Sequence, residues 1–176
     1  MSRLVALVGP PGCGKTTVCA RLAEAARARG LRVAGILSPG AEGDAAGRRA
    51  RVVLDLATGE ARPLGRRVAR PEGGHWDLDE GALAWGEHAA RAHADGADLL
   101  VVDELGPLEL VEGRGWSGCV EVLRGAAVRL AVASVREECL AALCAGLGPA
   151  AAVLEIVRVD EGSRDALPDR LLGALT

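Results

Sequence analysis

The 176-residue sequence predicts a three-layer α/β domain with a mostly parallel sheet, helices on both faces and an added β-hairpin. Three observations lead to this fold class. Short apolar runs alternate with segments of helical periodicity along the chain. A glycine-rich turn joins the first apolar run to the first helical segment. Two β-prone runs flank a turn-rich tetrapeptide, which predicts the hairpin.

The first half of the chain supplies the elements around the glycine-rich turn. Residues 3–8 are an apolar run, typical of a buried parallel strand. Apolar residues then recur at helical spacing from Thr16 to about Arg29, and Gly30 is the expected C-terminal cap. We expect a second strand, a mobile polar loop and the two hairpin strands to follow. Their ranges are 31–37, 38–47, 51–56 and 62–68.

The second half continues the alternation of helices and strands. A helix is predicted over residues 79–93, with Asp77 and Asp79 as capping residues. Strands are predicted at 98–103, 128–133 and 152–159, and helical stretches near 119–124, 137–147 and 164–172. No repeat, low-complexity tract or linker to a second core interrupts the pattern. We therefore expect one domain over residues 1–176.

Composition excludes several classes of protein. The net charge is −3 and the acids and arginines are interspersed, so we expect neither a nucleic acid nor a membrane partner. No apolar run approaches the roughly 18 to 20 residues of a membrane span, and the N-terminus starts as a strand rather than a signal peptide, which predicts a cytoplasmic protein. The sequence identifies no protein partner.

Cysteine, histidine and tryptophan give no sign of a metal or a cofactor. The five cysteines are an odd number without CxxC spacing, so reduced and mostly buried thiols are expected. The three histidines share no metal-ligand spacing with them. The three tryptophans are the only aromatic residues, and we expect them to pack in the core rather than to stack on a base.

Lysine occurs once in this sequence. The chain lacks Phe, Tyr, Asn and Gln, and Lys15 is the one lysine among 21 basic residues. We interpret the wider bias as pressure on the coding sequence. Lys15 lies within the glycine-rich turn, where a slim side chain that ends in a point charge can reach phosphate groups that a broad guanidinium cannot. Its retention at that position indicates phosphate chemistry.

The turn itself matches the pattern of a phosphate-binding P-loop, Gly-x-x-x-x-Gly-Lys-Thr, between a strand and a helix. Its glycines let backbone amides cradle phosphate oxygens, and the helix N-terminus adds a positive dipole. Lys15 is expected to neutralise phosphate charge and the Thr16 hydroxyl to bind Mg²⁺. The predicted nucleotide-binding residues of this segment are Gly9, Pro10, Pro11, Gly12, Cys13, Gly14, Lys15, Thr16 and Thr17.

A second motif is the acid pair at the end of the apolar run 99–102. Asp103 is predicted to hold the magnesium ion with Thr16, since a carboxylate at the end of a neighbouring strand lies beside the loop. Glu104, one residue further, is predicted to orient or deprotonate an attacking water. The pair favours hydrolysis over simple binding.

Taken with these motifs, the sequence resembles the THEP1-type nucleoside-triphosphatases, small P-loop proteins related in fold to nucleotide kinases, over nearly its whole length. Three stretches carry the resemblance: Gly-Pro-Pro-Gly-Cys-Gly-Lys-Thr-Thr at 9–17, Val-Asp-Glu-Leu-Gly-Pro-Leu-Glu-Leu at 102–110 and Ser-Arg-Asp-Ala-Leu-Pro at 163–168. The resemblance implies that the middle stretch lines the nucleotide site, which adds Gly106 to Asp103 and Glu104. It also implies that Arg136 stabilises charge on the transferring phosphoryl group.

The chain departs from the family pattern at several positions. Ile36, Leu37 and Ser38 replace the expected aromatic and threonine, and Arg51 stands where the family has Phe. An acid, a glycine and an arginine of the family find loose counterparts in Glu42, Gly47 and Arg48. Ser163 replaces an Asn, which leaves two interpretations open. Arg164 and Asp165 contact the base or ribose, or Ser163 caps a helix.

The leading hypothesis is Mg²⁺-dependent hydrolysis of ATP, GTP and other nucleoside triphosphates to NDP and phosphate, with Lys15, Glu104 and Arg136 as catalytic residues. The chain has no Asn and a single Lys, which excludes the Asn/Thr-Lys-x-Asp guanine motif of a dedicated Ras-type GTPase. The resemblance implies broad base tolerance. One alternative is a kinase that transfers the γ-phosphoryl group to a small acceptor, with Arg48, Arg49 and Arg51 available for a lid. A further alternative is a nucleotide-dependent accessory switch.

Overall fold

The computed structural model describes residues 3–41, 50–69 and 74–175. They form a nine-stranded sheet with the order β6-β5-β4-β2-β7-β8-β1-β9, and β3 pairs with β4 beside this path. Five neighbouring strands are parallel: β2 (Val33–Leu37), β7 (Leu99–Leu105), β8 (Leu130–Val135), β1 (Arg3–Val8) and β9 (Leu154–Arg158). Four are antiparallel: β3 (Gly40–Ala41), β4 (Ala50–Asp55), β5 (Ala61–Val68) and β6 (His75–Leu78).

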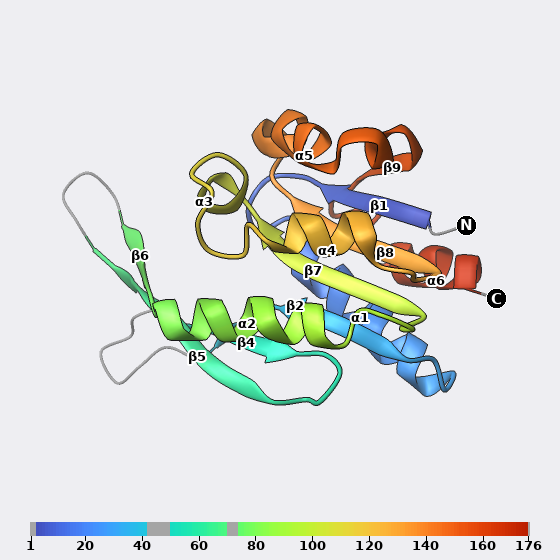
Figure 1. Cartoon of the computed structure of the whole chain (residues 1–176), viewed down its shortest axis with the longest axis horizontal. Coiled ribbons are helices and arrows are strands. Elements are labelled where there is room, and N and C mark those ends of the chain that lie inside the picture. Colours follow the sequence, from blue (N-terminus) through green and yellow to red (C-terminus); the bar gives the residue numbers. More distant parts are fainter. Residues whose placement is uncertain (1–2, 42–49, 70–73, 176) are drawn as a thin grey trace.

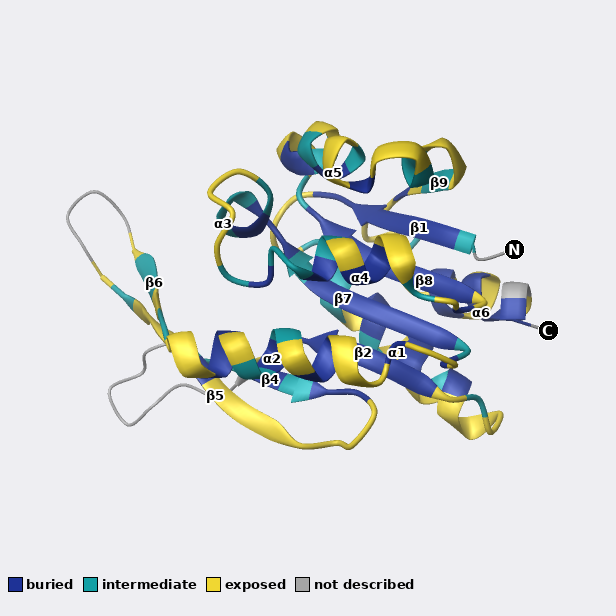
Figure 2. Cartoon of the chain, viewed as in Figure 1, coloured by how far each residue is buried: buried dark blue, intermediate teal, exposed yellow. Residues whose placement is uncertain are grey.

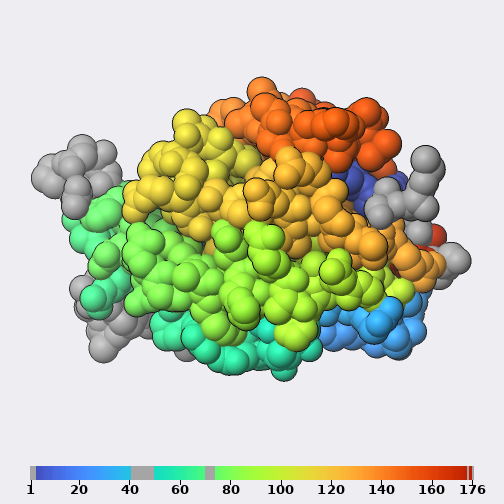
Figure 3. Space-filling view, viewed as in Figure 1, coloured from blue at the N-terminus to red at the C-terminus, as the bar shows by residue number. Residues whose placement is uncertain are grey.

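Helices cover both faces of the parallel strands (Figure 1). On one face lie α1 (Lys15–Ala28) and α6 (Leu167–Leu172), and on the other α2 (Glu80–Ala92), α4 (Cys119–Gly125) and α5 (Leu140–Leu147). The short elements are α3 (Pro107–Leu110), η1 (Glu137–Cys139), η2 (Gly148–Val153) and η3 (Gly173–Leu175). In the space-filling view, α2 and α4 form a continuous layer over their face (Figure 3). The three-layer α/β fold is confirmed.

Alternation along the strands divides the interior into two apolar cores. In β1, Val5 and Leu7 pack in the core beneath α1 and α6, whereas Leu4, Ala6 and Val8 pack in the core on the opposite face. Both faces of β1 and β7 are therefore buried, and the exposed residues gather on the outer sides of helices and on β5 (Figure 2). Near-continuous apolar runs are the sequence signature of such strands. This burial fixes the carboxyl ends of the parallel strands, where the candidate site lies.

The predicted hairpin is present as β4 and β5, but it is part of a larger antiparallel unit of β3, β4, β5 and β6, which we call the wing. The sequence did not predict β6 or β3, because runs of four and two residues are too short to show a period. The wing projects from one end of the molecule (Figure 1). Of the predicted mobile loop 38–47, residues 42–47 lie outside the described residues, together with Arg48 and Arg49.

Of the two capping residues predicted for the helix 79–93, Asp79 is confirmed and Asp77 is not, and of the two interpretations of Ser163 the helix cap is excluded. Asp79 is the N-cap of α2 and accepts a hydrogen bond of 2.7 Å from the backbone N–H of Ala82, whereas Asp77 lies within β6. Ser163 does not cap a helix, since α6 begins at Leu167. Instead, Ser163 and Asp160 exchange backbone-to-side-chain hydrogen bonds and close the turn before α6.

The three tryptophans differ in how deeply they are buried. Trp116 is buried, 2% exposed, and its indole N–H donates to the carbonyl of Leu83 at 3.1 Å, as expected of a core residue. Trp76, on β6, and Trp85, on α2, are partly buried, and each lies against an arginine. Trp85 also packs against the apolar core, as expected. Within the described ranges, no helix has the length and apolar character to cross a membrane.

Candidate nucleotide site

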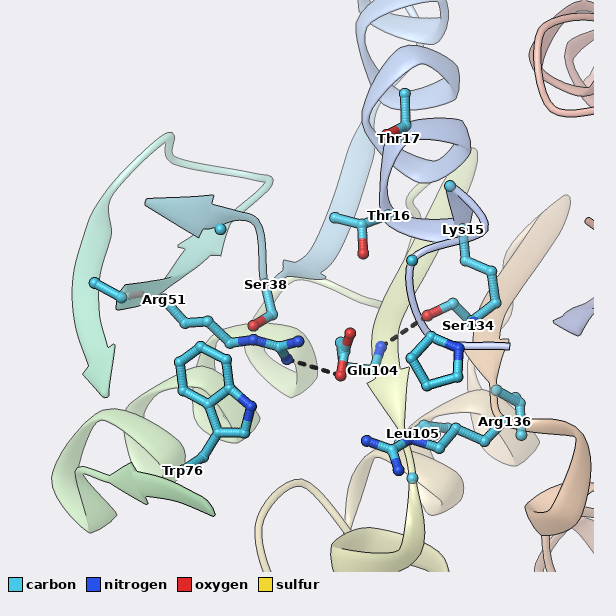
Figure 4. A pocket seen from close by; sticks show the side chains of 17 residues that line it. Lys15, Thr16, Thr17, Ser38, Arg51, Trp76, Glu104, Leu105, Ser134 and Arg136 are labelled. Carbon is cyan, nitrogen blue, oxygen red and sulfur yellow. Dashed lines mark hydrogen bonds and ion pairs between the residues drawn. The ribbon is translucent and has the colours of Figure 1, made fainter. Parts of the chain in front are cut away.

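The P-loop, residues 9–14, connects β1 to α1 at the carboxyl edge of the sheet. Gly14 is the N-cap of α1 with φ 105°, a left-handed conformation that side chains rarely adopt. This turn directs the first residues of α1 toward the loop's concave side, where free amides and the helix dipole attract an anion. Lys15, Thr16 and Thr17 form that first turn and line a cavity (Figure 4).

The ammonium group of Lys15 is held by the loop itself. Its Nζ donates to the carbonyls of Gly9 at 2.6 Å and Pro10 at 2.9 Å, and lies 3.8 Å from the sulfur of Cys13. These contacts bring the one lysine over the cradle that the glycines form. Gly9, Pro10 and Cys13 thus support Lys15, whereas Pro11, Gly12 and Gly14 line the cavity directly.

Asp103 lies behind Thr16 and is fully buried. Its Oδ1 accepts hydrogen bonds from the hydroxyls of Ser134 at 2.5 Å and Thr16 at 3.2 Å, and its Oδ2 accepts one from the backbone N–H of Ser38 at 3.1 Å. Burial raises the pKa of Asp103 above its ordinary value, and the hydrogen bond from Ser134 opposes that rise. Both oxygens of Asp103 are therefore oriented before any ligand binds.

Glu104 is turned out of the strand ladder into the cavity. The register of β7 against β8 shifts between Val102 and Leu105, and Glu104 has φ 70°. It is the only non-glycine residue with positive φ in the part of the chain that the structure describes. Its backbone N–H donates to the hydroxyl of Ser134 at 2.8 Å. Strained backbone of this kind is commonly found at functional sites.

The cavity in front of the loop has a volume of about 530 Å³, large enough for a nucleotide. Lys15, Thr16 and Ser134 line one side, and Arg51 and Trp76 line the other (Figure 4). Of the residues that the resemblance implied, Gly106 and Arg136 also line it. Arg136 packs beside Gly106 and makes no ion pair with any residue that the structure describes.

A second cavity, of about 510 Å³, adjoins the first. The two share a wall made by Ser38, Arg51, Trp76, Glu104, Gly106 and Arg136. Leucine side chains and Trp116 line much of the rest of the second cavity. Glu104 therefore faces both a phosphate-binding cradle and a partly apolar space.

Two serines of the site were not predicted from the sequence. Ser134 bridges the two acids, and Ser38 is 2% exposed with a hydroxyl that has no hydrogen-bond partner among the described residues. Each is a polar residue at the carboxyl end of an otherwise apolar strand, β8 or β2. A polar residue at the end of an apolar run is the feature of the sequence that could have identified these two serines. Trp76 and Arg51 also line the cavity, and their strands lie far from the P-loop in the sequence.

Other predicted contacts lie outside this cavity. Arg164 packs beside Gly14, and Asp165 pairs with Arg21 at 2.5 Å on the surface. All five cysteines are free thiols, three of them buried. Among the described residues, no group of three or more histidine, cysteine, aspartate or glutamate side chains is arranged to hold a metal ion.

Known proteins resemble this chain over most of its length. A family model described as NTPase matches residues 4–172. Nucleoside-triphosphatase THEP1 of Methanosarcina acetivorans is 35% identical over 174 residues, which cover 95% of this chain and 93% of that protein. The protein of the same name from Methanosarcina barkeri is 38% identical over 110 residues, which cover 60% of this chain and 62% of that protein.

Two solved structures share the fold. The solution structure of a human cancer-related nucleoside triphosphatase superimposes with a TM-score of 0.75 at 21% identity and covers 99% of this chain and 98% of that one. The crystal structure of THEP1 from Aquifex aeolicus gives a TM-score of 0.65 at 14% identity, with 98% of each chain covered. At these identities the likeness concerns the fold alone.

Proposed function

Because this chain belongs to the NTPase family and is therefore a hydrolase of nucleoside triphosphates, we propose that ATP, GTP and other nucleoside triphosphates are its substrates. Hydrolysis would give NDP and phosphate with Mg²⁺ as the metal. The observation that carries this proposal is the position of Glu104, which enters the cavity that Lys15 and Thr16 line. Five free cysteines also fit a cytoplasmic location, which we propose with it.

The loop binds the triphosphate in this proposal. Backbone N–H groups of residues 12–16, at the N-terminus of α1, would donate hydrogen bonds to the phosphate oxygens, and Lys15 would neutralise charge on the β and γ phosphates. Gly9 and Pro10 hold the Lys15 ammonium above the cradle through their carbonyls. The charge that develops on the phosphoryl oxygens is then stabilised by groups already in place.

The oxygen groups around Asp103 fit a magnesium ion. Mg²⁺ prefers oxygen ligands and keeps several waters, so it needs few protein groups. Thr16 would bind it directly, Asp103 would hold it or its waters, and the unpartnered hydroxyl of Ser38 would accept or donate to that water shell. A magnesium ion held by these residues would supply positive charge that stabilises the negative charge of the phosphate groups.

Glu104 would orient the attacking water in line with the γ phosphate and accept its proton. Arg136 lines the same cavity and has no ion partner among the described residues, so its guanidinium is available to the transferring phosphoryl group. Gly106 lies beside the Arg136 side chain and lines the same cavity.

A kinase is the second candidate, and the second cavity favours it. An attacking water occupies about 30 Å³, whereas the space beyond Glu104 has about 510 Å³. A small acceptor with a hydroxyl group placed beside Glu104 would receive the γ-phosphoryl group and lose its proton to that carboxylate.

Phosphate release from ATP, GTP, CTP and UTP with Mg²⁺ tests the proposal, with nucleotide binding measured in parallel. The native chain should hydrolyse several of them. Lys15→Ala should abolish hydrolysis, and Glu104→Gln should bind nucleotide but turn over about 1,000-fold more slowly, since general-base contributions have that order. Glu121→Gln, on the exposed side of α4, is the matched control and should behave as native.

Tight nucleotide binding by the native chain without any phosphate release would contradict the proposal. A labelled γ-phosphoryl group that appears on an added small alcohol would then favour the kinase. No transfer to any acceptor would leave the accessory switch, which a partner that accelerates hydrolysis would support.

A further inference from the structure

Arg51 meets the carboxylate of Glu104 on the wall between the two cavities. Its Nη1 lies 2.8 Å from Oε2 of Glu104, and the two side chains are 25% and 30% exposed. An ion pair in such a partly buried position is screened less by water than a pair on the surface. Arg51 is the cation that pairs with Glu104 among the described residues.

The antiparallel wing holds Arg51 in place. Its guanidinium lies over the indole ring of Trp76, 4.6 Å from the ring centre (Figure 4). The pairing of β4 with β5 shifts between Arg51 and Val52, and bulges of this kind re-aim side chains near active sites. Trp76 comes from β6, so two strands of the wing together aim one guanidinium at the site.

Glu104 is thus fixed from two directions. Ser134 holds its backbone N–H, and Arg51 holds its Oε2. A left-handed backbone with a free side chain would leave the carboxylate several rotamers. The ion pair with Arg51 engages Oε2 and leaves Oε1 to act on the attacking water of the proposed function.

We propose that Arg51 is a positioning residue for Glu104, so that the wing controls the orientation of the attacking water. This inference rests on the proposed function, in which Glu104 acts on that water. Arg51 acts through the carboxylate in this scheme and does not contact the nucleotide. The distinction can be measured, because an arginine that contacted the γ phosphate would contribute independently of Glu104.

A double-mutant cycle on kcat is the test, with Arg51→Met, Glu104→Gln and both together. Methionine keeps the apolar stem without the charge. Arg51→Met should lower kcat about 100-fold with little change in KM, since a displacement near 1 Å costs that much. The double variant should turn over within about threefold of Glu104→Gln alone, because Arg51 has nothing left to position.

Arg62 provides a matched control on the same wing. It lies over Trp85, 4.3 Å from the ring centre, and pairs with Glu60 at 2.9 Å, yet it lines neither cavity of the site. Arg62→Met and Trp85→Leu should leave kcat unchanged, whereas Trp76→Leu should lower it about 10-fold. Arg51→Lys should lose less kcat than Arg51→Met, since lysine keeps the positive charge but lacks the planar guanidinium group.

Additive losses of kcat in the cycle would overturn the proposal, because Arg51 would then act on the reaction by itself. An unchanged kcat in folded Arg51→Met would also overturn it. If Arg51→Met does not fold, Arg51→Lys and Trp76→Leu decide by the same split between kcat and KM. If the native chain binds nucleotide without hydrolysis, the proposed function fails. The same double-mutant cycle is then measured on the free energy of urea unfolding, which shows whether Arg51 holds Glu104. Additive effects of the two substitutions on stability would exclude that contact.

Discussion

At the residue scale, Ser134 connects the two acids of the site. Its hydroxyl donates to Asp103 and accepts from the backbone N–H of Glu104, and the residue is 1% exposed. Ser134→Ala leaves a buried donor and a buried carboxylate oxygen without this partner, which typically costs about 1–3 kcal/mol. We expect that loss in the free energy of urea unfolding, together with a fall in kcat.

Ser117→Ala is the control for that experiment. Its hydroxyl also bonds within the chain, to the carbonyl of Gly113 at 3.2 Å, but lies at an exposed position. The control should stay within about 0.5 kcal/mol of native stability. A native kcat in Ser134→Ala would show that Glu104 keeps its orientation without Ser134.

At the element scale, α3 follows the acid pair directly and is closed by Glu109. The Glu109 carboxylate accepts a hydrogen bond of 3.0 Å from the backbone N–H of Gly106, the N-cap residue of α3. Burial raises the pKa of Glu109 above its ordinary value, against the hydrogen bond from Gly106 that lowers it. Folding therefore favours the protonated form, and native stability falls as the pH rises through the raised pKa.

Glutamine keeps the accepting oxygen and does not ionise, so Glu109→Gln should gain stability over the native chain as the pH rises from about 4 to about 7. Urea unfolding at both pH values measures the difference. Glu112→Gln, exposed two residues beyond α3, is the matched control. If the native chain instead became more stable relative to Glu109→Gln over this pH range, the fold would stabilise the ionised form of Glu109 rather than destabilise it.

At the scale of the whole molecule, nucleotide binding should be visible in thermal unfolding. A non-hydrolysable ATP analogue with Mg²⁺ at about 100 times its Kd adds about 2.7 kcal/mol to stability. For a chain of this size that raises Tm by about 5–11 °C. Removal of Mg²⁺ with a chelator should abolish most of the shift, as should Lys15→Ala. An equal shift without metal would contradict the proposed role of Thr16 and Asp103.

The sequence predicted those parts of the molecule that repeat a local pattern. A strand that is buried on both faces shows a near-continuous apolar run, and these runs indicate the parallel strands. A helix that is buried on one face shows apolar residues at helical spacing, and this spacing indicates the helices. The P-loop was predicted for a similar reason, since phosphate binding needs several residue types within eight positions. The opposite wall of the site comes from Arg51 and Trp76, which only the pairing of β4, β5 and β6 brings together.

Short elements and single polar residues were not predictable in this way. A four-residue strand such as β6 has no period of its own, and its place depends on a neighbour to pair with. Ser38 and Ser134 are ordinary residues whose role arises from the parallel pairing of β2, β7 and β8, which brings both serines beside Asp103. Their importance depends on tertiary contacts, which local sequence does not contain.

The position of the one lysine has a consequence for covalent regulation. Acetylation, methylation and ubiquitin attachment at a side-chain amine all require lysine. In this chain they can occur only at Lys15, whose ammonium lies over the phosphate cradle. Acetylation there would remove the charge and fill the cradle in one step. Under the proposed function, acylation of a side-chain amine in this protein would therefore also stop its activity.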